Sequence, residues 1–394
     1  MSVITPDQLV GARSPIYITA GYSALTESIT DITLEVYVWN GSRSSRPASP
    51  DYTLFRDVFA GTDVSFDIAP LVSEEIGAIY DTADRVAPIG EQDTNIVWVQ
   101  IDYTVNYINK ADPPQTVNDT GSSDIFPVSN GYHTFAEGAN FEFPTTYLNN
   151  TSTVYVQEGG YEVMPLFMGK YNAETIEEVV YRVGGSDIFT FNIVSYHADL
   201  QPEDRILRIP FGEVGLNTWL TSSGYAGADS NRPINQTEWE MRLLDSNNTD
   251  LGTIKIVKQC ESKYTINTID YINRYGTWDY LHFFKASQDS FSTTSEQYRR
   301  SLGTSSTSGF SYDSTDEMYK QYNTNGKTRT TLNTGWVTED HREAIKDLMM
   351  SERVLLNGSP ISVVSNSANL QKSVNDKTIN YTIEVEEAFD TRYV

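Results

Sequence analysis

Residues 32–38 read Ile-Thr-Leu-Glu-Val-Tyr-Val, with an apolar side chain at every second position. Successive side chains of a β-strand point to opposite faces, so this stretch predicts a strand with one face against a core. Further strands are predicted at 16–18, 62–68, 97–105, 153–157, 161–168, 178–183, 188–195, 205–209, 238–244, 252–257, 361–364 and 378–387. The predicted fold is therefore mainly β with minor α.

The chain has 394 residues, which is too long for one ordinary core, and we expect three domains. Residues 1–125 are predicted to form an N-terminal β-sandwich and residues 126–259 a second β-sandwich-like domain. Residues 260–394 are predicted to form a C-terminal β-rich α+β domain. The stretch 109–152 is rich in Asp, Pro, Asn, Ser, Thr and Gly, which is typical of a linker or long loop.

One internal similarity suggests duplication of a sandwich. Val64–Val72 resembles Ile206–Val214, because each is a strand that runs into a proline-marked turn. One or two helical turns are expected after the first of these strands, at 71–76. Strands that end in this way are common in unrelated sheets, so the two readings, tandem duplication and coincidence, both stay open.

The predicted C-terminal domain contains one amphipathic helix, 338–351. Thr338 can serve as its N-cap, and four apolar side chains fall on one face, so the helix should pack on a sheet. These four are Ala344, Ile345, Leu348 and Met349. Two strands, 264–275 and 278–285, are expected before the helix, and Asn325-Gly326 is typical of a hairpin turn.

Residues 286–315 consist mainly of Ser, Thr and Gly, so we expect a mobile, exposed loop that contacts a partner. The strand that precedes this loop is dense in aromatic residues. Because the surrounding charge is acidic, core packing is a better expectation for them than stacking on nucleic acid. The residues concerned are Trp278, Tyr280, Phe283 and Phe284.

The composition excludes several classes of function. With 53 acidic and 28 basic side chains the net charge is −25, which disfavours nucleic acid and anionic lipid as partners. Solubility explains this charge more simply than a cation-binding role. The single cysteine, Cys260, cannot form an intrachain disulfide, and a reducing compartment is expected. The sequence shows no secretion signal and no apolar run long enough to span a membrane.

No catalytic or metal-binding motif is recognisable in the sequence. The four histidines lack the spacing of a metal site, and His341 is expected to be exposed on its helix. They are His133, His197, His282 and His341. Gly159-Gly160 and Gly184-Gly185 are predicted hairpin turns, because neither is followed by a helix or Lys-Ser/Thr as in a phosphate loop. The acidic run 313–317 lacks EF-hand spacing. No catalytic, cofactor-binding or metal-binding residue is predicted, no cofactor is expected, and the chain is not expected to be an enzyme.

Several segments resemble structural proteins of tailed bacteriophages, particularly phages of marine and Bacteroidetes hosts. The segments are Lys263–Gly276, Trp278–Lys285, Asn325–Lys327, Leu332–Val337, Ile379–Asp390, Leu34–Gly41 and Pro47–Leu54. The resemblance implies a non-enzymatic virion component of the tail tip, baseplate or tail ring. Such a protein would form a symmetric homo-oligomeric ring and adapt the tail to fibres or receptor-binding proteins.

The same resemblance implies other tail proteins as partners, such as tail tube, hub or fibres, with no nucleic acid and no membrane span. It places the chain in the virion tail, assembled in the host bacterial cytoplasm. Three alternatives stay open at this point: a receptor- or glycan-binding tail module, a capsid decoration protein, and a β-rich glycoside hydrolase or depolymerase.

Overall fold

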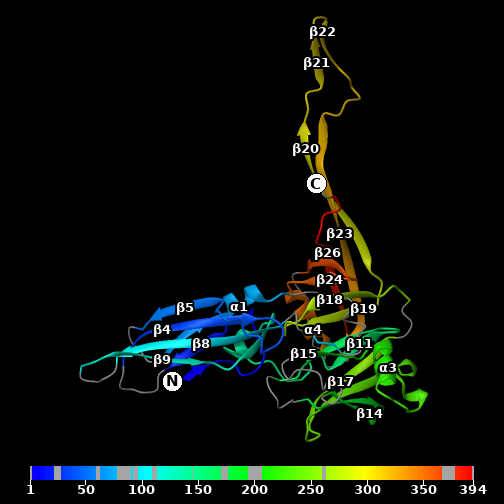
Figure 1. Cartoon of the computed structure of the whole chain (residues 1–394). Coiled ribbons are helices and arrows are strands. Elements are labelled where there is room, and N and C mark those ends of the chain that lie inside the picture. The colour runs from blue at the N-terminus through cyan, green and yellow to red at the C-terminus, as the bar shows by residue number, and fades with distance from the viewer. Residues whose placement is uncertain are drawn as a thin grey trace.

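Strands dominate the structure, as predicted, and the described residues add three α-helices to them. The computed structural model describes residues 2–21, 28–58, 63–77, 90–91, 96–108, 113–144, 146–169, 176–193, 206–259, 263–365 and 378–392. Cys260 and His197 lie outside these residues. A broad body built from several sheets carries one long, thin β-hairpin that projects away from it (Figure 1).

Two sheets share one core in the N-terminal part. Their strand orders are β1-β3-β6 and β2-β10-β8-β4-β5, with β9 paired to β8. The side chains of Ile32, Leu34 and Val36 are fully buried between them, so the alternation at 32–38 is confirmed and the arrangement is sandwich-like. The elements are β1 (Ser2–Ile4), β2 (Val10–Gly11), β3 (Tyr17–Gly21), β4 (Ser28–Trp39), β5 (Tyr52–Asp57), β6 (Asp63–Asp67), α1 (Ala69–Glu75), β8 (Ile96–Ile108), β9 (Thr116–Ser122) and β10 (Phe126–Ser129).

The predicted linker 109–152 is partly regular structure. Within it, β9 and β10 both pair with β8, and a 3-10 helix, η3 (Phe135–Glu137), follows. Phe126 and Val128 of β10 belong to the first core, which therefore extends past the predicted boundary at residue 125. The polar composition misled the prediction because β9 is an exposed edge strand, which needs few apolar side chains.

A second pair of sheets surrounds another core. Their orders are β11-β17-β16-β13-β14 and β12-β15-β7, and α3 packs against this core through Leu216, Trp219 and Leu220. The elements are β7 (Gly90–Glu91), β11 (Thr153–Gln157), β12 (Val163–Phe167), β13 (Glu178–Val183), β14 (Ser186–Asn192), β15 (Ile206–Pro210), α3 (Glu213–Ser222), η4 (Asp229–Asn231), η5 (Pro233–Asn235), β16 (Glu238–Leu244) and β17 (Asp250–Gln259).

The two similar segments noted in the sequence occupy comparable places. Each supplies one strand of a three-stranded sheet, β6 or β15, and each strand is followed by a helix, α1 or α3. The Pro-marked turn in the second segment thus leads into a ten-residue helix that the sequence did not predict. Whether the sandwiches arose by duplication stays a hypothesis.

The C-terminal part is one seven-stranded sheet, β19-β18-β24-β25-β26-β23-β20, covered by α4. Ala344, Ile345 and Leu348 are buried and Met349 packs beside them, so the predicted face of this helix is confirmed. The elements are β18 (Asn267–Ile272), β19 (Trp278–Phe283), β20 (Gln288–Arg299), β21 (Gly303–Ser306), β22 (Gly309–Tyr312), β23 (Tyr319–Thr338), α4 (His341–Met350), β24 (Val354–Leu356), β25 (Ser359–Val363) and β26 (Thr378–Glu387).

The helix begins three residues later than predicted, because Thr338 is the last residue of β23. Asp340 takes the N-cap position but makes no side-chain cap bond. Its Oδ2 instead accepts hydrogen bonds from the backbone N–H of Ser152, at 2.8 Å, and of Thr153, at 3.0 Å. The start of α4 is therefore tied to the second core.

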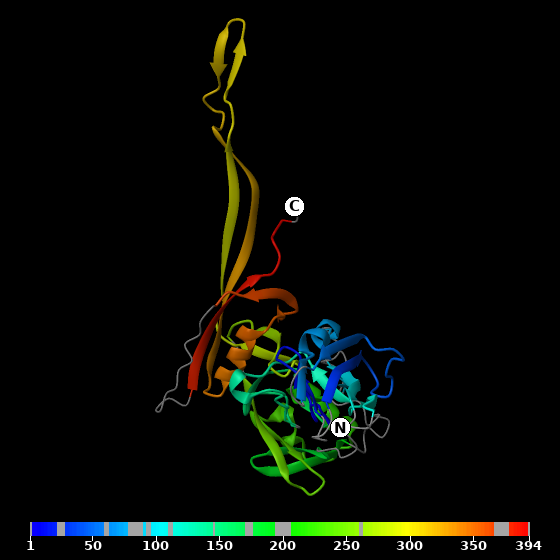
Figure 2. The same cartoon turned by 90° about the vertical axis from the view of Figure 1, so that its left-hand side faces the viewer.

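Further contacts join the three cores into one body, from which the hairpin projects. A fourth cluster of buried side chains draws on all of them, and includes Trp98, Phe167 and Tyr275. The hydroxyl of Ser129 donates to the carbonyl of Tyr275 at 2.7 Å, and β7, from the N-terminal region, pairs with β15. The hairpin rises from the C-terminal sheet at one side of this joined body (Figure 2).

Candidate interaction arm

The projecting hairpin, residues 288–329, is called the arm. In it β20 pairs antiparallel with the first half of β23, from Gln288 opposite Thr331 to Arg299 opposite Tyr319. The second half of β23 enters the body, where it pairs with β26 and buries Leu332 and Val337. Every residue of β20 is exposed. The expectation of a loop at 286–315 is therefore wrong for most of this segment, which forms strands, whereas its expected exposure is confirmed. Its mobility stays a prediction.

Asn325-Gly326 is also not the predicted hairpin turn, since both residues lie inside β23. Pairing along the whole of β20 fixes the register here and outweighs the local turn preference. The irregularity instead falls at Asn323, whose positive φ of 48° accompanies a register shift between Thr294 and Glu296. A β-bulge at this place bends the arm.

Two aromatic rings cover glycines in the arm. The ring of Phe291 lies over Gly326 of the opposite strand, and a Cβ at Gly326 would overlap it. Near the tip, where β21 and β22 form a small separate sheet, the ring of Phe310 covers Gly303 in the same way. Such pairs support a strand that has no core to pack on.

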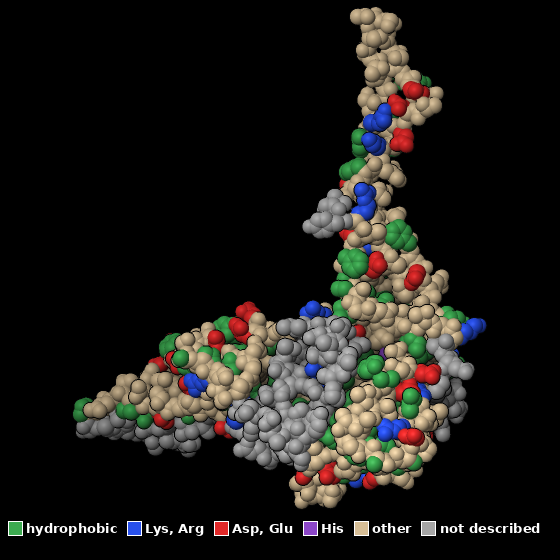
Figure 3. All heavy atoms as spheres, turned by 45° about the vertical axis from the view of Figure 1, so that its right-hand side comes forward, with side chains coloured by type: hydrophobic (Ala, Val, Ile, Leu, Met, Phe, Trp, Pro, Cys, Tyr) green, Lys and Arg blue, Asp and Glu red, His purple; other side chains and the backbone are tan. Residues whose placement is uncertain are grey.

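More apolar surface remains on the arm than these pairs explain. Seven of the eighteen exposed large hydrophobic side chains in the described part of the chain lie within residues 291–322. They are Phe291, Tyr298, Phe310, Tyr312, Met318, Tyr319 and Tyr322. Exposed hydrophobic side chains occur along the arm with both acidic and basic side chains between them (Figure 3). This concentration of exposed apolar side chains makes the arm a candidate surface for binding another protein.

The charge of the arm differs from that of the rest of the chain. It holds five acidic and five basic side chains, so its formal charge is zero while the whole chain carries −25. Arg300 pairs with Asp316 at 2.8 Å. The acidic run 313–317 holds itself together through Asp313, whose Oδ1 accepts hydrogen bonds from the Thr315 hydroxyl at 2.7 Å and from the Thr315 backbone N–H at 2.9 Å. These hydrogen bonds lower the pKa of Asp313. This run thus forms a local turn.

His341 occupies a different environment from the one predicted. His341 is 5% exposed, and its ring meets that of Tyr155 edge-on at 5.5 Å, so the expectation of a solvent-exposed side chain is wrong. Burial lowers its pKa to about 4. His133 is half-buried beside Phe141. The helix turns this His341 inward because it follows directly on the Asp340 contact with the second core.

His282 joins the second and third cores. Its Nε2 lies 2.9 Å from Oε1 of buried Glu162, and its Nδ1 lies 2.8 Å from the hydroxyl of Thr268. His282 and His341 both line a small cavity of about 10 Å³, together with Asp279, whose pKa burial raises to about 7. This cavity has room for about one water molecule. Among the described residues no three potential metal ligands form a cluster.

The four aromatic residues predicted to pack in the core differ in burial. Phe283 and Phe284 are buried, as predicted. Tyr280 is partly buried and stacks on Phe211 of the second core at 5.8 Å, and Trp278 is half-buried. These residues thus lie between cores as well as inside one.

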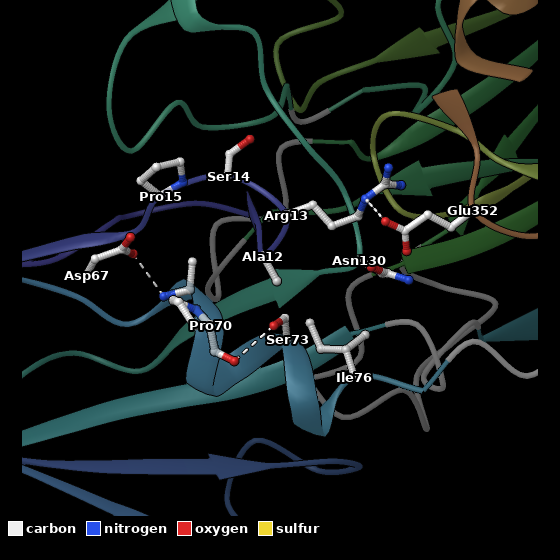
Figure 4. A pocket seen from close by; sticks show the side chains of 11 residues that line it. Ala12, Arg13, Ser14, Pro15, Asp67, Pro70, Ser73, Ile76, Asn130 and Glu352 are labelled. Atoms are coloured by element: carbon white, nitrogen blue, oxygen red, sulfur yellow. Dashed lines mark hydrogen bonds and ion pairs between the residues drawn. The ribbon is translucent and has the colours of Figure 1, made fainter. Parts of the chain in front are cut away.

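One larger pocket, of about 590 Å³, opens between α1 and the C-terminal part (Figure 4). Arg13 on its wall is already engaged: it pairs with Glu352 at 3.3 Å and donates to the carbonyl of Met350 at 3.0 Å. Asp67 accepts hydrogen bonds from the backbone N–H groups of Ile16 and Ala69. Because these charged groups are used to join parts of the fold, the pocket offers no converging set of reactive side chains.

Of the two predicted Gly-Gly hairpin turns, one is confirmed. Gly184-Gly185 joins β13 to β14 as a hairpin, with positive φ at both glycines. Gly159-Gly160 is a turn too, but β11 and β12 on either side lie in different sheets, so it is not a hairpin. The sequence did not predict the buried ion pair between Lys258 and Glu213, whose side chains lie 3.1 Å apart. These residues are 45 positions apart in the sequence, and no motif of that spacing indicates an ion pair.

No protein-family model and no curated protein sequence matches the chain. Among solved structures, a Ca²⁺-stabilised adhesin of an Antarctic bacterium that binds ice is 11% identical, with a TM-score of 0.19 over 84% of this chain and 69% of that one. The periplasmic chaperone SfaE is 7% identical, with a TM-score of 0.17 over 66% of this chain and 100% of that one. At such TM-scores these likenesses carry no argument about function.

Proposed function

We propose that this chain is a non-enzymatic structural protein of a tailed-phage virion, located in the tail tip, baseplate or tail ring. It assembles as a symmetric ring and connects the tail to fibres or receptor-binding proteins. The observation that carries the proposal is the arm, a long hairpin without a core of its own that projects from a closely joined body. The resemblance of the C-terminal segments to tailed-phage structural proteins supplies the location.

The energetics of the arm support a docking role. Its exposed tyrosines and phenylalanines leave apolar surface in water, which a partner would bury at about 25 cal/mol per Å². Its free strand edge is another surface that proteins normally protect. A protein that keeps both features gains from a partner that covers them. In a ring of such proteins, the extended arms could bind a neighbouring tail component through these surfaces.

The interior of the body supports a structural role over catalysis. Two titratable groups with strongly shifted pKa values, Asp279 and His341, face a cavity with room for about one water molecule. A substrate needs a larger site. Burial between two cores explains both pKa shifts without any reaction, so we assign these residues to stability.

A receptor- or glycan-binding tail module is the second candidate, because exposed aromatic side chains also form platforms for sugar rings. Tyr298 and Tyr322 lie with their ring centroids 5.7 Å apart at 66°, however, so they pack on each other and do not form one flat platform. This geometry favours protein docking over sugar binding.

Localisation on purified particles tests the proposal. The chain, extended by an affinity tag at a terminus, is labelled with gold and viewed by electron microscopy. Label at the tail tip or tail ring supports the proposal, and label on the head supports a decoration protein instead. Washed particles that contain none of the chain would exclude a virion role.

A further inference from the structure

Both edges of the upper arm carry no strand partner within the described part of the chain. β20 is the end strand of the seven-stranded sheet and pairs only with β23. On its other side, β23 pairs with β26 from Arg329 onward, and Thr391 and Arg392 bond to Gly326 and Asn325. The stretch Tyr319–Tyr322 lies beyond these contacts. The lower arm is thus covered on one side, whereas the upper arm is open on both.

The open edge of β20 lacks several of the usual protections against pairing. Edge strands are commonly short, broken by proline or studded with lysine. β20 has twelve residues, Gln-Asp-Ser-Phe-Ser-Thr-Thr-Ser-Glu-Gln-Tyr-Arg, with neither proline nor lysine. Its Thr and aromatic content favours strand pairing. An edge of this length and composition is suited to accept another strand.

We propose that the arms of neighbouring copies pair edge to edge, β20 of one copy against Tyr319–Tyr322 of the next. The two strands then run antiparallel, as β20 and β23 already do within one chain. Every arm uses one edge toward each neighbour, so the contact is head-to-tail and closes into a ring of arms. Closure leaves no free edge in the upper arm. This inference rests on the proposed ring and identifies a second copy as the partner of the arm.

The charges favour a second copy as the occupant. The copies repel one another through bodies that carry the whole net charge of −25, but the arm has a formal charge of zero and can approach another arm. Glu296 and Lys320 lie on the same face of the hairpin, because Glu296 pairs with Tyr322 and Lys320 with Tyr298. Placing Glu296 opposite Lys320 of the next copy therefore joins opposite charges on one face.

The same register adds a second complementary pair. It brings Arg299 beside Glu317 of the next copy. Neither of these side chains, nor that of Lys320, has an ion-pair partner among the described residues. Thr294 then lies opposite Tyr322, so a hydroxyl and a ring, which suit neighbouring strands, also meet on this face.

Cross-linking between differently labelled copies tests this register. Two single variants, Glu296→Cys and Lys320→Cys, are made in a full-length Cys260→Ser background and treated with a short bifunctional thiol reagent, alone and mixed. The proposal expects covalent dimers in the mixture and only background in either variant alone. Ser305→Cys at the tip, mixed with Lys320→Cys, is the matched control and should stay monomeric.

A different pairing would give a different pattern. If two β20 strands paired about a two-fold axis, with Asp289 opposite Arg299, then Thr294→Cys alone would cross-link, and this result would overturn the proposal. A charge exchange gives an independent readout by light scattering. Lys320→Glu should lose the oligomer and Glu296→Lys/Lys320→Glu in one chain should regain it, while circular dichroism stays that of the parent.

Failure of the inference can be told from failure of the proposed function. If no cross-link forms but the chain is found on the tail, the arm contacts a different protein and only the arm–arm pairing is wrong. If the chain is missing from particles yet the mixed variants cross-link, the pairing holds and the virion role is wrong.

Discussion

The ring of Phe291 on β20 lies across Gly326 on β23, and this contact explains how a hairpin without a core keeps its shape. Glycine weakens a strand because it offers no side chain to pack, and the ring replaces that missing surface. Phe291 is still 61% exposed, so the same side chain serves the hairpin and remains available to a partner.

Phe291→Ala should loosen the arm locally. The loss of one cross-strand contact is expected to cost about 0.2 to 1 kcal/mol, with little effect on the body. Hydrogen exchange measured by mass spectrometry should show faster exchange in β20 and in 319–328 only. Ser292→Ala, on the opposite face of β20, is the matched control. Unchanged exchange in the Phe291 variant would show that the ring does not support the strand.

Leu348→Ala should destabilise the C-terminal core by about 2 to 5 kcal/mol, because Leu348 is fully buried and its loss leaves a cavity. Lys346→Ala, on the outer side of α4, should stay within about 0.5 kcal/mol, since its ion pair with Glu343 is exposed. Urea unfolding of the two variants provides the comparison. Equal stabilities would mean that α4 is not the cover of this sheet.

Burial raises the pKa of Asp279 to about 7, so folding favours its protonated form. The stability that this gives is complete below the unfolded pKa, near 4, and is lost as the pH rises through about 7. Asp347, with a pKa raised to about 6, acts in the same direction. The Asp279→Asn side chain is neutral at every pH, so this variant lacks the part of the stability loss that ionisation of Asp279 causes.

Relative to the parent, the Asp279→Asn variant should therefore gain about 2 to 3 kcal/mol of unfolding free energy between pH 5 and pH 8. Denaturant unfolding at the two pH values measures this difference. Asp289→Asn, on the arm, is the exposed control and should show no such change. A parallel pH dependence in Asp279→Asn and the parent would contradict the assigned pKa.

His341→Ala should also destabilise the fold, by about 1 to 3 kcal/mol, since it removes a buried ring that packs against Tyr155. Because burial lowers the pKa of His341 to about 4, its contribution is complete above the unfolded pKa of about 6.5 and is lost as the pH falls toward 4. Thermal unfolding at pH 7 and pH 5 checks the sign. A variant as stable as the parent would show that the ring is not packed.

The hydrophobic periodicity of the sequence correctly predicted elements that bury one face against a core. The alternation in β4 and the apolar face of α4 were both correct, because burial on one face leaves a period of two or 3.6 in the sequence. The arm left no such period, since every side chain of β20 is exposed. The Ser-, Thr- and Gly-rich composition did indicate that this segment is exposed and suited to contact a partner. It could not indicate β20, because this strand forms by pairing with β23, which is distant in the sequence.

The buried polar contacts could not be predicted for another reason. Glu162 and His282 meet across 120 residues of sequence, and Asp340 contacts Ser152 across 188. No motif encodes such distances, because the partners are brought together by the packing of separate cores. His341 was wrongly predicted to be exposed for the same reason. Its charged neighbours on the helix suggested an exposed face, whereas contacts with a separate core bury it.

Removal of the arm tests the central claim most directly. Residues 290–329 are replaced by Asn-Gly, a two-residue turn that joins paired strands, so that β20 and β23 end at the body. The account predicts a chain that folds with the thermal stability of the parent body but is missing from purified particles. Incorporation of the trimmed chain into particles at the level of the parent would contradict it.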